Sequence, residues 1–425
     1  MEILLNIISF ITLAISYKCR KFRHSLLTIF CGLWFLICFL YSFKFYDIYD
    51  VKTETLLMYT LGILFYFAGY VTYKGCRKKR CLQDSKYKRR VKILKLLAIL
   101  SIFVLVQKAI LAIPIWLSGG VGDLKSDIVE NNVLGLDLIS EIIYTFVARP
   151  LIIVFVIYSV ILILQKHKEK SVFFLTFLMI LLGYVCTGSK FMIVEVILMS
   201  LTYIFIFNYN SIFTIVRRNR KLFVIILLII CVLYILLSAK GEGLNQSLYS
   251  YVCGCIPCSD NALDSIKREP PFWGLATFNG FLRIFSLPLS LIGFPELKSI
   301  LDLVFSYMLN FEETMMISPT IKYNAFISLF SYFYADGGLL GVVFISFIYG
   351  NLSNRICSKA ISSPTYMNVS LLLFTSFLIY TSMVRANTFM VYYVLPYFYI
   401  YFLIPRKPLV IIKTRKPLVI IKNET

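Results

Sequence analysis

Charged side chains embedded in long apolar stretches are the residues of this sequence best placed to do chemistry. Arg149 lies within TFVARPL, Glu195 lies within FMIVEVIL, and Asp336 follows the aromatic run FSYFYA and precedes a Gly-Gly pair. An Arg or Lys at the centre of a membrane helix costs about 2.5–3.5 kcal/mol on insertion scales, so such residues usually serve an internal pair or a binding site. These three residues are the first candidates for a functional site.

Arg149 and Glu195 allow more than one interpretation. Arg149 is followed by Pro150 and lies well inside its apolar stretch, which predicts that its guanidinium faces a polar interior. Glu195 lies about one and a half helical turns beyond Lys190. It is either the ion-pair partner of Arg149 or a site residue, and the sequence leaves both interpretations open.

Long apolar stretches dominate the chain and predict an all-α, polytopic membrane helix bundle. Of the 425 residues, 59% are hydrophobic, and the mean hydropathy of +0.81 is far above that of a soluble protein. The stretches have the length of membrane helices, and lipid requires every backbone group to be paired within the protein. The eleven predicted transmembrane helices are residues 3–17, 25–43, 56–73, 93–117, 141–165, 172–187, 190–207, 222–238, 337–354, 367–384 and 389–405.

The placement of charge predicts the orientation of these helices. The net charge of +21 comes from basic clusters that, with eleven helices, all fall on one side of the membrane. Because Lys and Arg favour cytoplasmic loops, we expect an external N-terminus and a cytoplasmic C-terminus, and no nucleic-acid partner. The predicted parts are residues 1–238 with eight transmembrane helices, a large external loop at 239–336, residues 337–405 with three transmembrane helices, and a basic cytoplasmic tail at 406–425.

Several cations lie on the outer side, where positive charge is unusual. Lys108, Lys190 and Arg385 lie near the ends of predicted helices, so each is either an interfacial anchor or part of a site. A group of cations at the outer leaflet suits an anionic headgroup, because Arg and Lys form charge-assisted hydrogen bonds with phosphate. The other polar candidates on this side are Lys240, Arg283, Lys322 and Asn324.

Several reaction classes lack the residues that they need. The only histidines, His24 and His167, are on the predicted cytoplasmic side, so histidine is not available as a base at the outer face. The sequence has no Walker A loop, no G-x-S-x-G and no HExxH motif, and its large loop has no D-x-D carboxylate pair. We expect neither a cofactor nor a metal site. The energy for a reaction would come from an activated substrate, such as a sugar on a diphosphate.

The large loop has the character of a membrane-surface structure. Residues 279–294 and 300–311 are rich in apolar side chains with scattered polar ones, as in helices that lie on a membrane. A substrate handled there would itself be amphipathic, such as a lipid-linked one. The motif CGCIPC at 253–258 also lies in this loop, and one disulfide among its three cysteines is compatible with an oxidising compartment.

Three segments and the architecture are similar to those of one group of membrane proteins. TGSKFMIVEVIL at 187–198 corresponds to a Gly-Ser-Arg turn in that group, and AKGEG at 239–243 corresponds to an Arg-Gly pair at the start of a large loop. NAFISLFSYFYADGGLLGVVFISFIYG at 324–350 matches a pattern of Asn, Tyr or Phe, Asp, Gly and Gly. With ten or more membrane helices and one large external loop before the last three, the chain resembles the O-antigen polymerase (Wzy-type) family over most of its length.

The resemblance implies a glycosyltransferase of the bacterial inner membrane. Members of this family join oligosaccharide repeat units linked to polyprenyl diphosphate at the outer face of that membrane. It also implies contact with membrane lipids and a chain-length regulator protein as partners. Lys190 and Lys240 stand where Arg is common in the family, which keeps the charge but loses the bidentate fork. The family's Arg-x10-Gly pattern is not reproduced, since the interval from Arg283 to Gly293 is one residue shorter.

Asp336 becomes a candidate catalytic residue in this context, with Glu195 as the second. Asp336 lies at the outer end of the predicted helix 337–354, where it can orient or deprotonate an acceptor hydroxyl. The alternative is a helix N-cap, because Asp ahead of a helix accepts free amide hydrogens and suits the helix dipole. The expected residues for binding diphosphate or sugar are Arg149, Lys190, Lys240, Arg283, Lys322, Asn324 and Arg385.

Two other functions fit a chain of this architecture. An O-antigen ligase uses the same carrier, but that family is expected to use a histidine in the large loop, and residues 239–336 contain none. A flippase for lipid-linked oligosaccharides, which is a transporter and not an enzyme, typically has short loops on both sides. The length of the predicted loop therefore favours the polymerase over the flippase, and its lack of histidine favours the polymerase over the ligase.

Overall fold

Helices form most of the described chain in the computed structural model, which describes residues 1–73, 87–126, 137–165, 167, 169–188, 191–207, 244–312, 314–324 and 327–409. The helices of the first half are α1 (Glu2–Lys18), α2 (Leu26–Tyr41), α3 (Thr53–Thr72), α4 (Tyr87–Ser126), α5 (Leu138–Ile143), α6 (Arg149–Leu164), α7 (Lys170–Thr187) and α8 (Phe191–Phe207). Those of the second half are α11 (Leu244–Cys253), α12 (Cys255–Ile266), α13 (Asn279–Leu291), α14 (Pro295–Leu309), α15 (Leu329–Ser362), α16 (Tyr366–Tyr380) and α17 (Val391–Leu403). The shorter elements are the 3-10 turns η1 (Phe45–Asp47), η5 (Asn310–Glu312), η6 (Thr381–Met383) and η7 (Asn387–Phe389), the π-helical turn η3 (Tyr144–Ala148), and the strands β1 (Thr314–Met316) and β2 (Lys322–Asn324).

The length and composition of these helices indicate an all-α, multi-pass membrane protein. Among the described residues, six helices are long and apolar enough to cross a membrane, namely Thr53–Thr72, Tyr87–Ile115, Ile139–Leu164, Lys170–Thr187, Leu329–Ser362 and Tyr366–Met383. Three shorter apolar helices are Leu26–Tyr41, Val194–Phe207 and Val391–Leu403. Each predicted transmembrane helix within the described residues falls on a helix, whereas the one predicted at 222–238 lies outside them.

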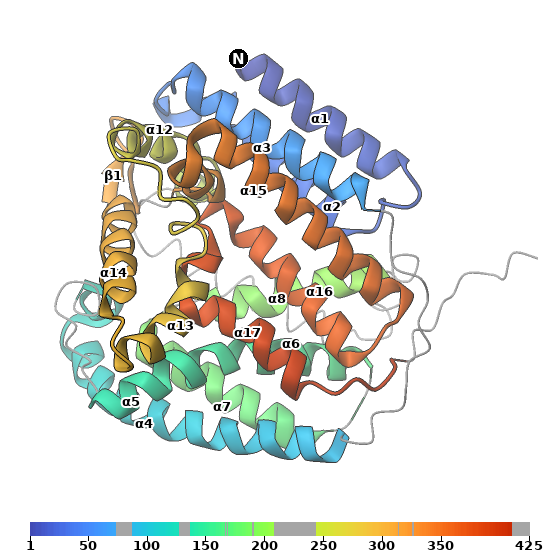
Figure 1. The fold of residues 1–425 in the computed structure, drawn as a ribbon, viewed down its shortest axis with the longest axis vertical. Helices are drawn as coiled ribbons and strands as arrows, with labels where there is room; N and C mark the ends of the chain where they lie inside the picture. The colour runs from blue at the N-terminus through green and yellow to red at the C-terminus, as the bar shows by residue number, and fades with distance from the viewer. Residues whose placement is uncertain are drawn as a thin grey trace, which may run out of the picture.

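The helices pack around two hydrophobic cores. The first core lies mainly among α1, α2, α3, α12 and α15 and includes the fully buried Trp34 and Phe330. The second core lies among α4, α6, α7, α8, α16 and α17. Helix α6 is apolar on all sides, which is typical of a helix surrounded by others, and it is buried along most of its length. Figure 1 shows α3 and α15 side by side, and α6, α16 and α17 packed against one another.

Glycines let α3 and α15 approach each other closely. A Cβ atom at Gly69 would overlap the carbonyl oxygen of Phe347, and one at Gly350 would overlap the carbonyl oxygen of Tyr66. Such contacts through small residues are how helices associate in a membrane, where lipid gives no hydrophobic driving force between them. The close contact between α3 and α15 therefore fixes how these two helices pack in the first core.

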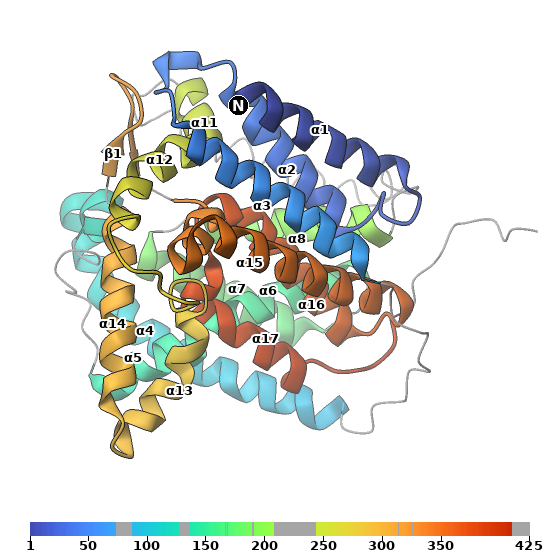
Figure 2. The ribbon, with the colours of Figure 1, turned by 45° about the horizontal axis from the view of Figure 1, so that its top comes forward.

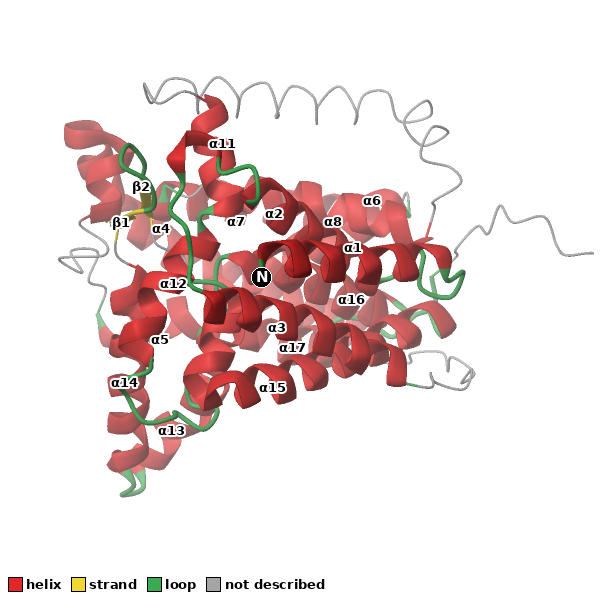
Figure 3. Cartoon of the chain, turned by 90° about the horizontal axis from the view of Figure 1, so that it is seen from above, coloured by secondary structure: helices red, strands yellow, loops and turns green. Residues whose placement is uncertain are grey.

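Residues 244–324 gather at one end of the bundle, which we call the loop end. Helices α11–α14 and the β-hairpin lie there, whereas α15 leads into α16 at the opposite end (Figures 1 and 2). Figure 3 shows the same gathering from above. The Tyr59 hydroxyl donates to the Cys255 carbonyl at 3.0 Å, and the Lys52 amide donates to the Asp260 carboxylate at 2.9 Å. The loop is thus fastened to the transmembrane helices.

Helix α15 differs from the prediction at its start. The predicted membrane helix began at residue 337, whereas α15 begins at Leu329 and places the last residues of the predicted loop in a helix. Burial of the aromatic side chains in this stretch accounts for the longer helix. The predicted boundary is present as a break, because the backbone is non-helical at Gly337 and at Gly338, where φ is 61°. Glycine adopts positive φ without the steric cost that a side chain brings.

Helices α13 and α14 confirm the two amphipathic helices predicted in the loop. Helix α14 begins five residues before the predicted 300–311 segment, at Pro295. An ion pair between Arg283 and Asp302 joins the two helices. Their exposed apolar side chains include Phe281, Phe285, Ile300 and Leu303. The hairpin of β1 and β2 was not predicted, because three-residue strands carry too little alternation to be recognised.

Candidate functional site

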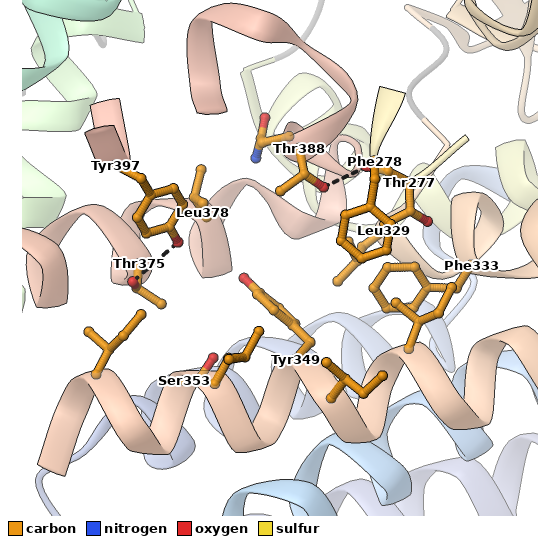
Figure 4. Close-up of a pocket in the computed structure, with 15 residues that line it drawn as sticks. Thr277, Phe278, Leu329, Phe333, Tyr349, Ser353, Thr375, Leu378, Thr388 and Tyr397 are labelled. Atoms are coloured by element: carbon orange, nitrogen blue, oxygen red, sulfur yellow. Dashed lines mark hydrogen bonds between the residues drawn. The ribbon is translucent and has the colours of Figure 1, made fainter. Parts of the chain in front are cut away.

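An apolar pocket lies among α15, α16, α17 and the segment ahead of α13. Its volume is about 220 Å³. Figure 4 shows Tyr349 and Ser353 pointing into it from α15, across from Thr375 on α16 and Tyr397 on α17. The lining residues are Thr277, Phe278, Leu329, Phe333, Ile345, Ile348, Tyr349, Leu352, Ser353, Ile356, Thr375, Leu378, Asn387, Thr388 and Tyr397.

The pocket borders the exposed face of α15. Ile348 and Leu352 line it and are 50% and 47% exposed. Leu340 and Phe344, about two turns and one turn before Ile348, are 69% and 65% exposed, so this face meets lipid in a membrane. An apolar cavity of about 150 Å³ binds benzene. A pocket of this size and lining can therefore hold a short stretch of hydrocarbon chain.

Arg149 is the first residue of α6 and faces the start of α17. The π-helical turn η3 precedes it, so the backbone before it is irregular, and Pro150 follows it and fixes the backbone after it. Its guanidinium lies 3.5 Å from the centre of the Tyr392 ring. Electrostatic interactions also connect it with Tyr144, Tyr393 and Arg385. Two arginines and several tyrosines from three segments thus form one cluster.

Glu195 belongs to the same cluster. Its side chain is only 4% exposed, and its Oε2 atom has no hydrogen-bond partner among the described residues. It interacts electrostatically with Arg149 and with Tyr393. No ion pair joins Glu195 to Arg149 within 4.0 Å in the described part of the chain, so the predicted direct pair is not formed. Glu195 is a buried carboxylate close to cations.

The arginine cluster and the pocket share one piece of chain. Arg385 is two residues before Asn387, which lines the pocket. The backbone amide of Arg385 donates to the Thr381 carbonyl at 3.2 Å. The Asn387 side chain donates to the Thr381 hydroxyl. On α17, Tyr393 of the cluster and Tyr397 of the pocket are one helical turn apart. The cluster therefore adjoins the wall of the pocket.

Asp336 is buried at the break in α15 and does not line the pocket. Its Oδ1 accepts the amide hydrogen of Ala276 at 2.9 Å, and its Oδ2 accepts that of Thr277 at 2.9 Å. No described amide of α15 donates to this carboxylate, so the N-cap predicted for the helix after Asp336 is not formed. Both oxygens are instead committed to the amides of a different segment. This occupation also opposes a direct catalytic role for the carboxylate.

Most of the other predicted site residues lie apart from this cluster. Arg283 forms an ion pair with Asp302, and its guanidinium lies 4.1 Å from the centre of the Phe305 ring, so it joins α13 to α14. Lys322 is exposed on β2 opposite Met316, and Asn324 ends the same strand. The structure therefore brings neither Arg283 nor Lys322 to Arg149.

Lys108 is not an interfacial anchor in the predicted sense. It is 8% exposed, its Nζ lies 3.3 Å from Glu141 Oε2, and it also lies 3.9 Å from the centre of the Tyr144 ring. Lys190 and Lys240, predicted to bind phosphate, lie outside the described residues. Their positions relative to the cluster stay predictions.

The cysteines of the CGCIPC motif are buried thiols. Cys253, Cys255 and Cys258 are each 0% exposed and none is in a disulfide, so the disulfide considered from the sequence is not formed. Among the residues that the structure describes, no group of three or more His, Cys, Asp or Glu side chains could hold a metal ion. The motif contributes to the first core, as small apolar residues do.

Sequence reasoning missed Tyr392 and the pocket wall formed by Asn387 and Thr388. A signal for the pocket wall was present, since ANT at 386–388 places polar residues between two apolar stretches and directly after Arg385. Tyr392 could not be singled out, because the following helix contains many tyrosines. Contact with Arg149, which is distant in sequence, is what distinguishes it.

The chain was compared with protein-family models, with curated proteins and with solved structures. No family model matches it, no curated protein matches it, and no solved structure matches it. The function is therefore argued from the geometry described above.

Proposed function

We propose that the protein is a glycosyltransferase that polymerises oligosaccharide repeat units carried on polyprenyl diphosphate, as O-antigen polymerases do. The reaction would take place at the outer face of a bacterial inner membrane, with the loop end facing outward. The observation that carries the proposal is an intramembrane arginine, stacked on Tyr392, beside an apolar pocket that borders lipid. A lipid-linked diphosphate requires both of these features.

The arginine cluster supports binding of the diphosphate. No described carboxylate forms an ion pair with Arg149, so its charge is balanced by aromatic rings and by the more distant Glu195. Arginine binds phosphate oxygens through two parallel N–H donors, which a stacked guanidinium can still offer at its edge. Arg385 adds a second positive charge to the same site.

The pocket and the loop end support a substrate with an apolar tail and a polar head. The pocket would hold the part of the polyprenyl chain nearest the diphosphate, because its lining is apolar and its volume of about 220 Å³ suits a short hydrocarbon stretch. The exposed aromatic side chains Trp273, Phe278 and Phe281 lie at the loop end near the pocket. Such rings pack against membrane headgroups and sugar faces.

The proposed reaction transfers the growing glycan from its carrier to a new unit. The acceptor hydroxyl attacks the anomeric carbon of the donor, and a glycosidic C–O bond forms as the C–O bond to the carrier diphosphate breaks. The diphosphate leaves with the electron pair of that bond, and Arg149 and Arg385 would stabilise its charge. Glu195, whose Oε2 has no partner in the described residues, would accept the hydroxyl proton.

The glycan pattern on a gel after deletion of the gene tests this function. Loss of the polymer ladder with one repeat unit still attached supports a polymerase, whereas loss of every unit indicates a ligase or flippase and contradicts the proposal. The complementing variants are Arg149→Ala and Arg149→Lys, compared at matched membrane abundance. We expect neither to restore the ladder, because lysine lacks the planar fork.

A matched control separates a site effect from a general loss of positive charge. Lys298 is an exposed cation of α14 at the loop end, outside the cluster and the pocket. Lys298→Ala should restore the full ladder. A full ladder from Arg149→Ala would contradict the assignment of the diphosphate site.

A further inference from the structure

Residues 272–278, which connect α12 to α13 and which we call the strap, are bound to the break in α15. The Phe272 amide donates to the Ala335 carbonyl at 3.0 Å, and the Trp273 amide donates to the Asp336 carbonyl at 3.1 Å. The amides of Ala276 and Thr277 donate to the two carboxylate oxygens of Asp336. Four hydrogen bonds from one short segment therefore end on two consecutive residues.

The break in α15 makes these bonds available. In a continuous helix the carbonyls of Ala335 and Asp336 would accept amides four residues later, within the helix. The non-helical backbone at Gly337 and Gly338 removes those partners. The two carbonyls then accept the strap amides in their place, and the carboxylate adds two more acceptors at the same point.

The strap also forms the wall of the pocket at the loop end. Thr277 and Phe278 line the pocket, as do the neighbouring Asn387 and Thr388. The Thr388 hydroxyl donates to the Thr277 carbonyl at 2.7 Å, and Figure 4 shows this bond at the edge of the pocket. The strap is thus held on one side by Asp336 and on the other by the turn that follows Arg385.

The start of α13 restricts the strap further. A Cβ atom at Gly280 would overlap the backbone of Met390 at the start of α17. The residues directly after the strap are therefore in close contact with the helix that carries the tyrosines of the cluster. A displacement of the strap would move both the pocket wall and the turn that carries Arg385.

We propose that Asp336 is a positioning residue that holds the strap in place, so that Thr277 and Phe278 define the loop end of the pocket and the Arg385 turn keeps its position. Asp336 does not touch the substrate, because its two oxygens accept backbone amides and its side chain is 4% exposed. The consequence for the reaction rests on the proposed function. The attachment of the strap rests only on the hydrogen bonds.

Hydrogen exchange of the purified full-length protein tests the attachment without any assay of activity. In Asp336→Asn a side-chain NH2 group would face one strap amide. Both groups are donors, so one hydrogen bond to the strap is lost although the side chain keeps its size. We expect faster amide exchange in a peptide covering the strap and unchanged exchange in α14, as measured by mass spectrometry. Unchanged exchange in the strap would overturn the proposal.

Kinetics with a synthetic polyprenyl-diphosphate-linked repeat unit test the role in the reaction. A positioning residue for the pocket should raise KM by a larger factor than it lowers kcat when Asp336 is replaced by Asn. A general base would instead lower kcat by about 10²–10⁴ with little change in KM. That second pattern would overturn the positioning role and make Asp336 catalytic.

A second variant covers the case in which Asp336→Asn fails to accumulate. Thr388→Val removes the other attachment of the strap and leaves the carboxylate intact. Like Asp336→Asn, it should raise KM, and it should accelerate amide hydrogen exchange at Thr277 and Phe278. An unchanged KM and unchanged exchange in this variant would count against the strap as the pocket wall. If the wild-type protein polymerises nothing, the proposed function fails while the exchange result still decides the attachment.

Discussion

Arg149 differs from Lys108 in what balances its charge. Lys108 has the Glu141 carboxylate at 3.3 Å, whereas Arg149 has the Tyr392 ring at 3.5 Å. A desolvated cation–π contact is worth about 2 kcal/mol or more, which offsets much of the roughly 2.5–3.5 kcal/mol that an intramembrane arginine costs. The ring also leaves the edge of the guanidinium available for a ligand. Stability and binding can therefore coexist at this residue.

Glu195→Gln is predicted to remove most of the polymer without lowering membrane abundance. Glutamine has nearly the same shape, and Oε2 has no hydrogen-bond partner in the described residues, so little folding energy depends on that oxygen. The negative charge, and with it the ability to accept a proton, is lost. The measurement is the glycan ladder at matched abundance, with a general-base contribution of about 10²–10⁴ in rate as the expected scale.

The matched comparison for this prediction is Glu296→Gln, since Glu296 is an exposed carboxylate of α14 at the loop end, outside the cluster. This variant should keep the ladder. If Glu195→Gln also gave a full ladder, Glu195 would only fill space beside the second core, and its proposed role as the base would have to be abandoned.

The sequence identified Arg149 and Glu195 because a charge in an apolar stretch is visible without knowledge of the fold. It could not show that Asp336 binds the strap, because the two ends of those hydrogen bonds are about sixty residues apart. The same limit applies to Arg283, whose partner Asp302 lies in the neighbouring helix of the loop. Residue type predicts the need for a partner, whereas tertiary packing selects the partner.

At the scale of elements, the contact between α3 and α15 makes a second prediction. Gly69→Ala should lower thermal stability in detergent and membrane abundance, because its Cβ would meet the backbone carbonyl of Phe347, which cannot rotate away. Overpacking of this kind typically costs about 1–3 kcal/mol. The control is Gly32→Ala on α2, where the nearest atom to a Cβ is a Leu13 methyl at 3.9 Å. Equal stability of the two variants would contradict the close crossing.

Helix boundaries show how far apolar patterning reaches. Each membrane helix that it predicted within the described residues falls on a helix, and six of the described helices are long and apolar enough to cross a membrane. It placed the start of α15 at residue 337, since Asp336 and the Gly-Gly pair read as a helix start. Burial of the preceding aromatic residues overrides that signal and extends the helix to Leu329. The Gly-Gly pair instead produces the break that binds the strap.

At the scale of the whole molecule, the two ends of the bundle differ in what they carry. The loop end carries α11–α14 and the β-hairpin, together with the strap and the pocket wall (Figure 2). The opposite end carries the basic link between α1 and α2 and the link between α15 and α16. A lipid-linked glycan would meet the loop end, and the basic links would face the cytoplasm under the positive-inside rule.

Reporter fusions test this orientation of the whole chain. We predict that alkaline phosphatase, which is active only after export, is active when fused after Lys298 of α14, since that residue lies at the loop end. Green fluorescent protein, which folds in the cytoplasm, should fluoresce when fused after Thr425. The reason is that the basic links and the basic tail favour the cytoplasmic side, where Lys and Arg are retained during insertion. The reciprocal fusions, phosphatase after Thr425 and fluorescent protein after Lys298, should both be inactive. Active phosphatase after Thr425 would show that the orientation is the reverse of the predicted one. The pocket, the strap and the arginine cluster would then lie on the side where no exported glycan is assembled, and this result would contradict the polymerase proposal.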